Sequence, residues 1–420
     1  MNVLKEKGIF AFICSNKFAK AKYGEKLRKL ILENQLKIYY DFTGVKVFKE
    51  ASVDTCVIQI KKDFKNDNEI YVDNNYYLKQ KLLNKNSFTF KSPEVLNLRD
   101  KILSLGIPLK DLDVKINRGV LTGFNKAFII DEETKNRLIK EDSNNKEIIK
   151  PILRGRDINK WKILYQNLYL IHSVDGLNTK EEYPYIYEFL QQYQEKLEKR
   201  YDKGKNWFNL RSCSYDYLFE KEKIIYSEIS PEPSFTFDSE NYYLGNTAYL
   251  INSDTINLKY LLALLNSNVL FWIFKQICYN LGKSGFRFIK NFVEQLPIVL
   301  SQKYEKEILV LVDTILDLTK ELNKKENEMY AIFKNELNII KLTKKLEKFY
   351  LLSNTELLKE LKKKNKNFDE KNLIKIFEKN KNDINSLNCT LEQKIFELNK
   401  IVYEIYNLNE EEIIIIENDI

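Results

Sequence analysis

The chain has 420 residues, of which 44% are hydrophobic, 30% are charged and one, His172, is a histidine. This length predicts two or three domains, and the apolar content excludes a wholly disordered chain. The single histidine excludes a zinc or iron site built from several histidines, and a Ser-His-Asp or Cys-His centre would need this one residue. We therefore expect His172 to be structural, and we predict no metal site.

The formal net charge of +8 is unevenly distributed along the chain. Residues 1–115 hold 22 Lys/Arg and 14 Asp/Glu, whereas 116–300 carry a net charge of +2 and 301–420 a net charge of −2. Lysine, asparagine and isoleucine are abundant throughout, as a low-GC coding bias would produce, so the lysine count alone does not indicate function. A basic first quarter could attract phosphate backbones, but such an excess is more often a solvated face.

The cysteines indicate reduced thiols in a cytoplasmic protein, because they are odd in number, scattered and without a CxxC pair. They are Cys14, Cys56, Cys213, Cys278 and Cys389. The apolar stretch 8–14 is too short for a signal peptide, and no segment approaches the length needed to cross a bilayer. We therefore expect a cytoplasmic protein without a membrane partner.

The first 62 residues predict the edge of a mixed α/β sheet. The short apolar run 8–14 predicts a buried strand. Apolar residues along one face predict a helix over 21–35, and further strands are expected at 38–42 and 55–60. This order of strand, helix, strand and strand is typical of such a sheet.

Residues 63–115 are polar and predict a connector with a short helix near 95–105. From 116 to about 250 the pattern predicts short, aromatic-rich strands, interrupted by a helix over 179–203. The strands are expected at 127–130, 168–171, 223–227 and 248–251.

Helical spacing begins at 258–273 and dominates after residue 300. Two apolar repeats, 308–322 and 391–405, each cover only about two heptads, which favours packed helices over a long coiled coil. The lysine-rich run 362–366 between them is expected to be an exposed insertion.

Two glycines, Gly119 and Gly123, lie close together beside Arg118 and Lys126. Glycines at such spacing permit tight turns or close approach of the backbone to a ligand. Since no GxGxxG occurs, nucleotide binding is not indicated, and a turn is the simpler interpretation.

The segment 150–161 gathers cations around Gly155. Its Arg154, Arg156 and Lys160 could clamp phosphates, and arginine can also bind guanine through two hydrogen bonds. Alternatively, Asp157 could hold the arginines in an internal ion pair. The residues alone leave both possibilities open.

Five segments in order resemble a known family. They are INRGVLTGFNKAFIID at 116–131, KPILRGRDI within 149–161, 223–251 ending in GNTAY, LLALLNS at 261–267 continuing to EQLPI at 294–298, and 398–416 with VY and YNLNEEE. Together they are similar to the TaqI-like DNA-specificity domain of N6-adenine DNA methyltransferases and type IIG restriction-modification enzymes. The N-terminal stretch from KGIFAFI at 7–13 to residue 62 resembles the end of their methyltransferase domain.

The resemblance implies a C-terminal part of such an enzyme. The Asn-Pro-Pro-Tyr loop of the family does not occur in this chain, and neither does its glycine-rich S-adenosylmethionine loop. We therefore predict no catalytic residue, no bound cofactor and no methylation by this chain alone, with S-adenosylmethionine serving the complete enzyme.

The fold class expected is mixed α+β. It would comprise a partial methyltransferase edge at 1–62, a connector at 63–115, a strand-rich target-recognition domain at 116–300 and a helical region at 301–420. The family resemblance implies double-stranded DNA as a partner, read by side chains in the major groove while the target adenine is flipped.

The residues expected to face DNA are Arg118, Lys126, Arg154, Arg156 and Lys160, with Lys283 and Arg287 as second choices. Gly119, Gly123, Gly155 and Gly245 are expected to form turns of the specificity domain. Two alternatives remain: a separately encoded specificity subunit that docks a methyltransferase partner, and a helical adaptor without enzymatic function.

Overall fold

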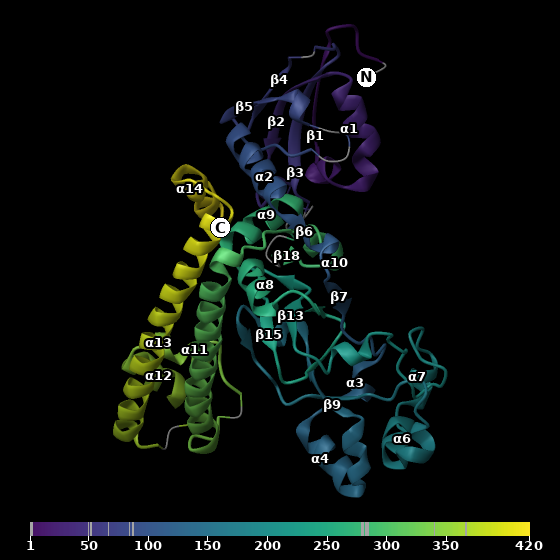
Figure 1. The fold of residues 1–420 in the computed structure, drawn as a ribbon, viewed down its shortest axis with the longest axis vertical. Helices are drawn as coiled ribbons and strands as arrows, with labels where there is room; N and C mark the ends of the chain where they lie inside the picture. Colours follow the sequence, from purple (N-terminus) through teal and green to yellow (C-terminus); the bar gives the residue numbers. More distant parts are fainter. Residues whose placement is uncertain are drawn as a thin grey trace. The chain divides into compact units, whose positions relative to one another are not determined.

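The computed structural model describes residues 3–48, 50, 53–65, 67–83, 85, 88–278, 281, 285–339, 341–365 and 368–420. The chain divides into two compact units (Figure 1). One unit comprises Met1–Leu105 with Tyr279–Lys283, and the other comprises Gly106–Cys278 with Ser284–Ile420. Helices and several small sheets both contribute, and the C-terminal part is helical, which confirms the mixed α+β expectation.

The first unit is built on a sheet with strand order β1-β3-β2-β4-β5. The strands are β1 (Ile9–Ser15), β2 (Gln35–Asp41), β3 (Thr55–Lys61), β4 (Glu69–Val72) and β5 (Tyr76–Lys79). All neighbours are antiparallel except β2 and β4, which run parallel. The helices are η1 (Asn16–Ala19), η2 (Lys22–Gly24), α1 (Glu25–Leu32), η3 (Gln80–Leu82) and α2 (Pro93–Leu105). Ile31 of α1 packs in one apolar core with Leu36 and Ile58 of the sheet.

Two expectations for this unit differ from the structure. The strand at 8–14 is present as β1, but it is not buried: Ile9 and Phe12 are 58% and 54% exposed. Among the described strands, β1 pairs only with β3, so its other edge has no strand partner there. The range 63–115, expected as a connector, contributes β4, β5 and α2, because its scattered apolar residues such as Ile70 and Leu78 complete the core.

The second unit holds two four-stranded sheets. One has the order β15-β13-β17-β7, formed by β7 (Lys115–Arg118), β13 (Lys223–Ser227), β15 (Thr236–Asp238) and β17 (Ala248–Asn252). The other has the order β16-β9-β12-β8, formed by β8 (Ile129–Ile130), β9 (Ile149–Leu153), β12 (Tyr169–Ile171) and β16 (Tyr243–Leu244). Short pairs join β10 (Ile158–Asn159) to β11 (Lys162–Ile163), β14 (Ile229–Ser230) to β18 (Phe286–Arg287), and β6 (Ile107–Pro108) to β19 (Pro297–Ile298).

Short helices surround these sheets. They are η4 (Leu109–Asp111), α3 (Asn125–Phe128), α4 (Glu132–Glu141), η5 (Ser143–Glu147), η6 (Gly155–Asp157), α5 (Thr179–Glu182), α6 (Pro184–Gln191), α7 (Gln194–Glu198), η7 (Asp216–Leu218), α8 (Leu258–Leu265), α9 (Asn268–Ile277) and α10 (Lys290–Val293). The expected helix over 179–203 is thus divided into α5, α6 and α7, and the one over 258–273 breaks at Ser267, whose hydroxyl caps α9.

A pair of long helices forms the C-terminal part of this unit: α11 (Gln302–Asn335) and α13 (Glu370–Ile405) lie side by side (Figure 1). Between them come η9 (Leu346–Leu351) and α12 (Asn354–Lys362), and α14 (Glu410–Asp419) follows. The expectation of packed helices is therefore confirmed. The closing helix expected over 398–416 is broken at Asn409, which caps α14 through its side chain.

No single described helix is long and apolar enough to cross a membrane. The helices α8 and α9 meet the length and hydropathy criteria only together, as a pair bent by 63°.

Candidate nucleic-acid interface

A buried carboxylate holds two of the expected arginines together at one end of the β13–β17–β7 sheet. Glu228 directly follows β13, and its side chain is 8% exposed. Arg118, at the end of β7, donates from Nη2 to Glu228 Oε2 at 2.5 Å. Arg287, on β18, donates from Nε and Nη2 to Glu228 Oε1 at 2.9 and 2.7 Å.

The two guanidinium groups are oriented by further contacts but remain about half exposed, at 46% and 49%. Arg118 Nε donates to the carbonyl oxygen of Asn246 at 2.6 Å, and its guanidinium carbon lies 5.7 Å from the centre of the Tyr249 ring. One carboxylate therefore binds both guanidinium groups. Arginines fixed in this way are suited to binding phosphate or guanine through paired hydrogen bonds.

The turn that contains Arg154 and Arg156 packs against the same region. Gly155 N donates to Thr247 Oγ1 at 2.9 Å, and Glu228 N donates to the carbonyl oxygen of Thr247 at 2.9 Å. Asn246, which accepts from Arg118, directly precedes Thr247. The turn and the arginine pair therefore contact the same short segment, 246–247. We call Arg118, Arg156, Glu228 and Arg287 the arginine cluster.

Within the turn the two arginines have different roles. Arg154 donates from Nε and Nη2 to the two carboxylate oxygens of Asp157 at 2.9 and 2.8 Å, which raises the pKa of the guanidinium. Asp157 is 3% exposed and also accepts from the backbone of Arg154. Arg156 is exposed and forms no ion pair with the described residues. Arg154 is therefore structural, and Arg156 is the available cation.

The glycines explain how the segments approach so closely. A Cβ atom on Gly119 would lie 2.3 Å from the carbonyl oxygen of Gly245, and one on Gly155 would lie 2.4 Å from that of Thr247. Gly123 adopts φ +65°, a left-handed conformation that favours glycine. Gly245 itself has space for a side chain, because its nearest neighbour, the Leu153 oxygen, would be 3.7 Å away.

The remaining expected residues lie outside the arginine cluster. Lys126 is exposed on α3, and Lys160 lies half-buried between β10 and β11, where burial lowers its pKa. No hydrogen bond or ion pair joins either lysine to the cluster in the described part of the chain. Lys283 falls outside the described residues.

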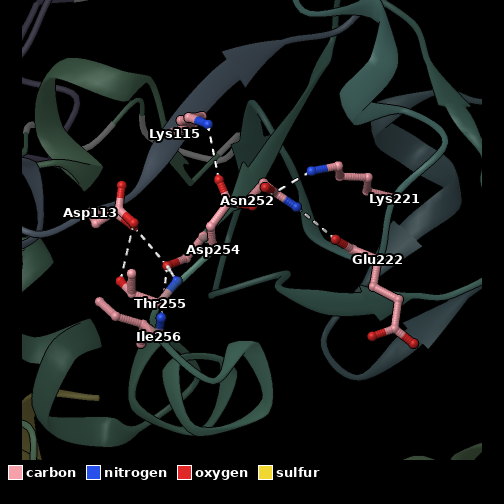
Figure 2. A network of polar contacts seen from close by, with 9 residues as sticks. Asp113, Lys115, Lys221, Glu222, Asn252, Asp254, Thr255 and Ile256 are labelled. Carbon is pink, nitrogen blue, oxygen red and sulfur yellow. Dashed lines mark hydrogen bonds and ion pairs between the residues drawn. The ribbon is translucent and has the colours of Figure 1, made fainter.

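The opposite end of the same sheet carries a second polar network, which sequence reasoning missed. Asp254 lies between Lys115 and Lys221, at 3.2 and 3.5 Å from their amino groups (Figure 2). These contacts raise the pKa of Lys115 and lower that of Asp254. Nearby, Ser253 and Thr255 donate to Asp113. The cations here are matched by acids, so the network is suited to tying strands together rather than to binding an anion.

Glu228 was also not predicted, although it organises the arginine cluster. It lies 110 residues from Arg118 and 59 from Arg287 in the sequence, and a lone glutamate after a strand carries no local signal. Strand pairing brings the three together: Tyr249 faces Arg118 between β17 and β7, and Ile229 faces Arg287 between β14 and β18.

Two glycines of the first unit are closely packed. In the first unit, a Cβ atom on Gly8 or Gly24 would lie 2.8 Å and 2.2 Å from the carbonyl oxygens of Lys5 and Phe18. The backbone at both glycines therefore packs against the chain itself. No group of three or more His, Cys, Asp or Glu side chains in the described ranges is placed to hold a metal.

Comparison with known families shows what three parts of this chain are similar to. Residues 150–298 match the TaqI-like C-terminal specificity domain, and residues 1–48 match the Eco57I restriction-modification methylase. Residues 301–402 match a domain of unknown function, DUF8810. The chain is thus similar to a TaqI-like specificity domain over 150–298 and to a methylase over 1–48, and the expected resemblance to methyltransferases of restriction-modification systems is confirmed.

The chain is also similar to individual proteins. The chain is 23% identical over 384 residues to the type II methyltransferase M.BstVI of Geobacillus stearothermophilus, covering 81% of this chain and 67% of the relative. It is 25% identical over 248 residues to the type II methyltransferase M.MjaIV of Methanocaldococcus jannaschii, covering 55% of this chain and 80% of the relative. Among solved structures, the type IIL restriction-modification enzyme MmeI in complex with DNA matches with a TM-score of 0.45 and 14% identity, over 95% of this chain and half of that chain.

Proposed function

We propose that this chain is the DNA-recognition part of an adenine-specific (N6) methyltransferase of a restriction-modification system. The observation that carries the proposal is the arginine cluster: three arginines from separate segments, two of them held by one buried glutamate. Arg156, Glu228 and Arg287 lie within residues 150–298, which match the specificity domain, and Arg118 joins them from the preceding segment. Arg118 and Arg287 are half exposed and oriented, as base or phosphate recognition requires.

In this proposal the exposed cations position double-stranded DNA and a subset reads base edges. Arg156 is available for a phosphate because nothing among the described residues neutralises it. Arg118 and Arg287 are candidates for guanine, because Glu228 holds their planes in place and a bidentate contact depends on orientation. Cofactor binding and methyl transfer would belong to the complete enzyme, which uses S-adenosylmethionine.

Salt-dependent DNA binding tests the proposal. The purified chain should bind duplex DNA, measured by fluorescence anisotropy, with an affinity that falls steeply as salt rises. Triple substitution of Arg118, Arg156 and Arg287 by alanine should abolish the preference between duplexes. Absence of salt-dependent binding would contradict the proposal and favour a helical adaptor.

A methyl-transfer assay tests the absence of catalysis. The chain, incubated with duplex DNA and labelled S-adenosylmethionine, should give no incorporation above background. Incorporation would contradict the assignment of catalysis to residues outside this chain.

A second candidate, a specificity subunit that docks a methyltransferase partner, is favoured by β1. Its Ile9, Phe10 and Phe12 are exposed, and its outer edge is unpaired among the described residues. An unpaired apolar edge is a site for strand addition. Co-expression with a separately encoded methyltransferase should raise solubility and activity, and charged substitution of Phe12 should remove that effect. No gain on co-expression would contradict docking. Cytoplasmic location, expected from the cysteines, stays a prediction.

A further inference from the structure

The connection between the two long helices carries a concentrated positive charge. Residues 334–381, which we call the basic tip, hold 14 lysines and seven acidic residues, a net charge of +7. The rest of the range 301–420 holds seven lysines and 16 acidic residues, a net charge of −9. A coding bias would raise the number of lysines throughout the chain. It therefore does not explain why one part of the helical region is strongly positive and the rest strongly negative.

The lysines of the basic tip are available to a partner. Those exposed and without an ion pair to any described residue include Lys344, Lys345, Lys359, Lys371, Lys375 and Lys379. Lys362 and Lys363 are paired with Glu370 and Glu360, but their side chains are still 48% and 56% exposed. The positive charge is therefore presented to solvent rather than compensated internally.

The basic tip has a core of its own, which fixes the direction of these lysines. Leu357 and Leu361 of α12 and Leu373 and Phe377 of α13 lie in one buried cluster. At 100° per residue, Lys371 and Lys375 project from the face of α13 opposite to that core.

The helices α12 and α13 share an outer surface. Asn354 Nδ2 donates to Glu378 Oε1 at 2.6 Å, and Lys362 lies 2.7 Å from Glu370. These contacts join the two helices at both ends of α12, with the common core on one side. Lys359 of α12 therefore lies on the same outer surface as Lys371 of α13.

The acidic remainder of the helical region has partners in the chain. Glu326 of α11 lies 2.6 Å from Lys162, and Asp313 lies 2.5 Å from Lys259. The acids thus attach α11 to the lysines of the specificity region. The ion pairs of the tip lysines in the described part of the chain, by contrast, are with Glu360 and Glu370 of the tip itself.

We propose that the basic tip is a second, sequence-independent contact with the DNA phosphate backbone. Exposed lysines on adjacent helices are suited to phosphates, since ammonium groups act as point charges and carry no base specificity. The choice of DNA over another polyanion rests on the proposed function of the specificity domain in the same chain. The tip begins eight residues, about 12 Å, beyond Glu326, where α11 contacts Lys162 of the specificity region, so it would contact DNA that extends past that region.

Duplex length separates the two contacts. A 12-bp duplex, about 40 Å long, reports on the specificity domain, whereas a 40-bp duplex of about 135 Å can also reach the tip. We would measure anisotropy of the full chain on both duplexes against salt. The variant replaces Lys359, Lys371, Lys375 and Lys379 by glutamine.

The matched control replaces four exposed lysines of the acidic remainder by glutamine: Lys306, Lys320, Lys324 and Lys400. The tip variant should bind the 40-bp duplex at least about tenfold more weakly at 0.1 M salt and lower the salt slope by about 2 to 4. Its binding to the 12-bp duplex should equal that of the control variant.

Equal binding of the 40-bp duplex by the tip and control variants would overturn the proposal. If the tip variant loses affinity equally for the 12-bp and the 40-bp duplexes, the proposal is also overturned, since the tip would then act through the specificity domain. If the unmodified chain binds neither duplex, the proposed function fails as well. Binding to vesicles of phosphatidylglycerol that the tip variant loses, with DNA binding retained, would indicate a membrane instead.

Discussion

Replacing Glu228 by glutamine is the sharpest perturbation of the arginine cluster. The substitution keeps the size of the side chain and removes the charge that holds Arg118 and Arg287. Three charge-assisted hydrogen bonds are weakened. Such bonds contribute about 1.5–3 kcal/mol each when buried, but both arginines are about half exposed, so solvent screening reduces the total.

We expect a loss of about 1–2 kcal/mol in the free energy of unfolding. For a unit of this size that lowers the Tm by roughly 2–6 °C. Loss of the negative charge of Glu228 should strengthen non-specific DNA binding at low salt and steepen its salt dependence by about one unit. Discrimination between a selected and a scrambled duplex should fall about tenfold or more, because a bidentate contact needs a fixed guanidinium plane.

The assay is competition anisotropy, with a duplex selected by the unmodified chain from a randomised pool and a scrambled competitor. Glu240→Gln is the matched control, since Glu240 is exposed in the same region and loses the same charge. Equal discrimination and equal Tm for the two variants would refute the role assigned to Glu228.

Three further predictions concern the same region. Arg156→Ala should weaken DNA binding by about 1 kcal/mol or more and leave the Tm unchanged. Arg154→Ala should instead lower the free energy of unfolding by about 2 kcal/mol, because it leaves the buried carboxylate of Asp157 unpaired. The reverse pattern, measured by anisotropy and thermal melts, would contradict both roles. Lys223→Met should cost about 3–5 kcal/mol in denaturant unfolding, because its carboxylate partner, 2.7 Å away, is also fully buried; an unchanged midpoint would show that the pair is not buried in solution. Gly119→Ala should cost about 1–3 kcal/mol through a backbone clash, and Gly245→Ala, which has space, should not; equal melting temperatures would contradict the close approach.

Strands with continuous apolar runs could be predicted closely from the sequence. The strand expected at 223–227 is β13, and the one expected at 248–251 is β17 with one further residue. Both are buried along their whole length, and that burial is what produces the apolar runs. The strand predicted at 127–130 was wrong in its first half. Asn125–Phe128 is the single helical turn α3, and only Ile129–Ile130 is a strand. Four residues do not distinguish a helical period from a strand period.

The candidate site could be predicted only in part. Arg118, Arg156 and Arg287 stood out as cations near glycines or in segments similar to the family. Their convergence depends on Glu228 and on pairings between segments more than 50 residues apart, for which one sequence holds no signal. The sequence left open whether Arg154 binds a phosphate or forms an internal ion pair. Its two hydrogen bonds to Asp157 show the internal ion pair.

Selection from a pool of 40-bp duplexes with a randomised centre tests the central claim most directly. The unmodified chain should enrich one short motif, and the chain with Arg118, Arg156 and Arg287 replaced by alanine should enrich none. A pool that stays random with the unmodified chain, or a motif that survives the triple substitution, would contradict the assignment of DNA recognition to the arginine cluster.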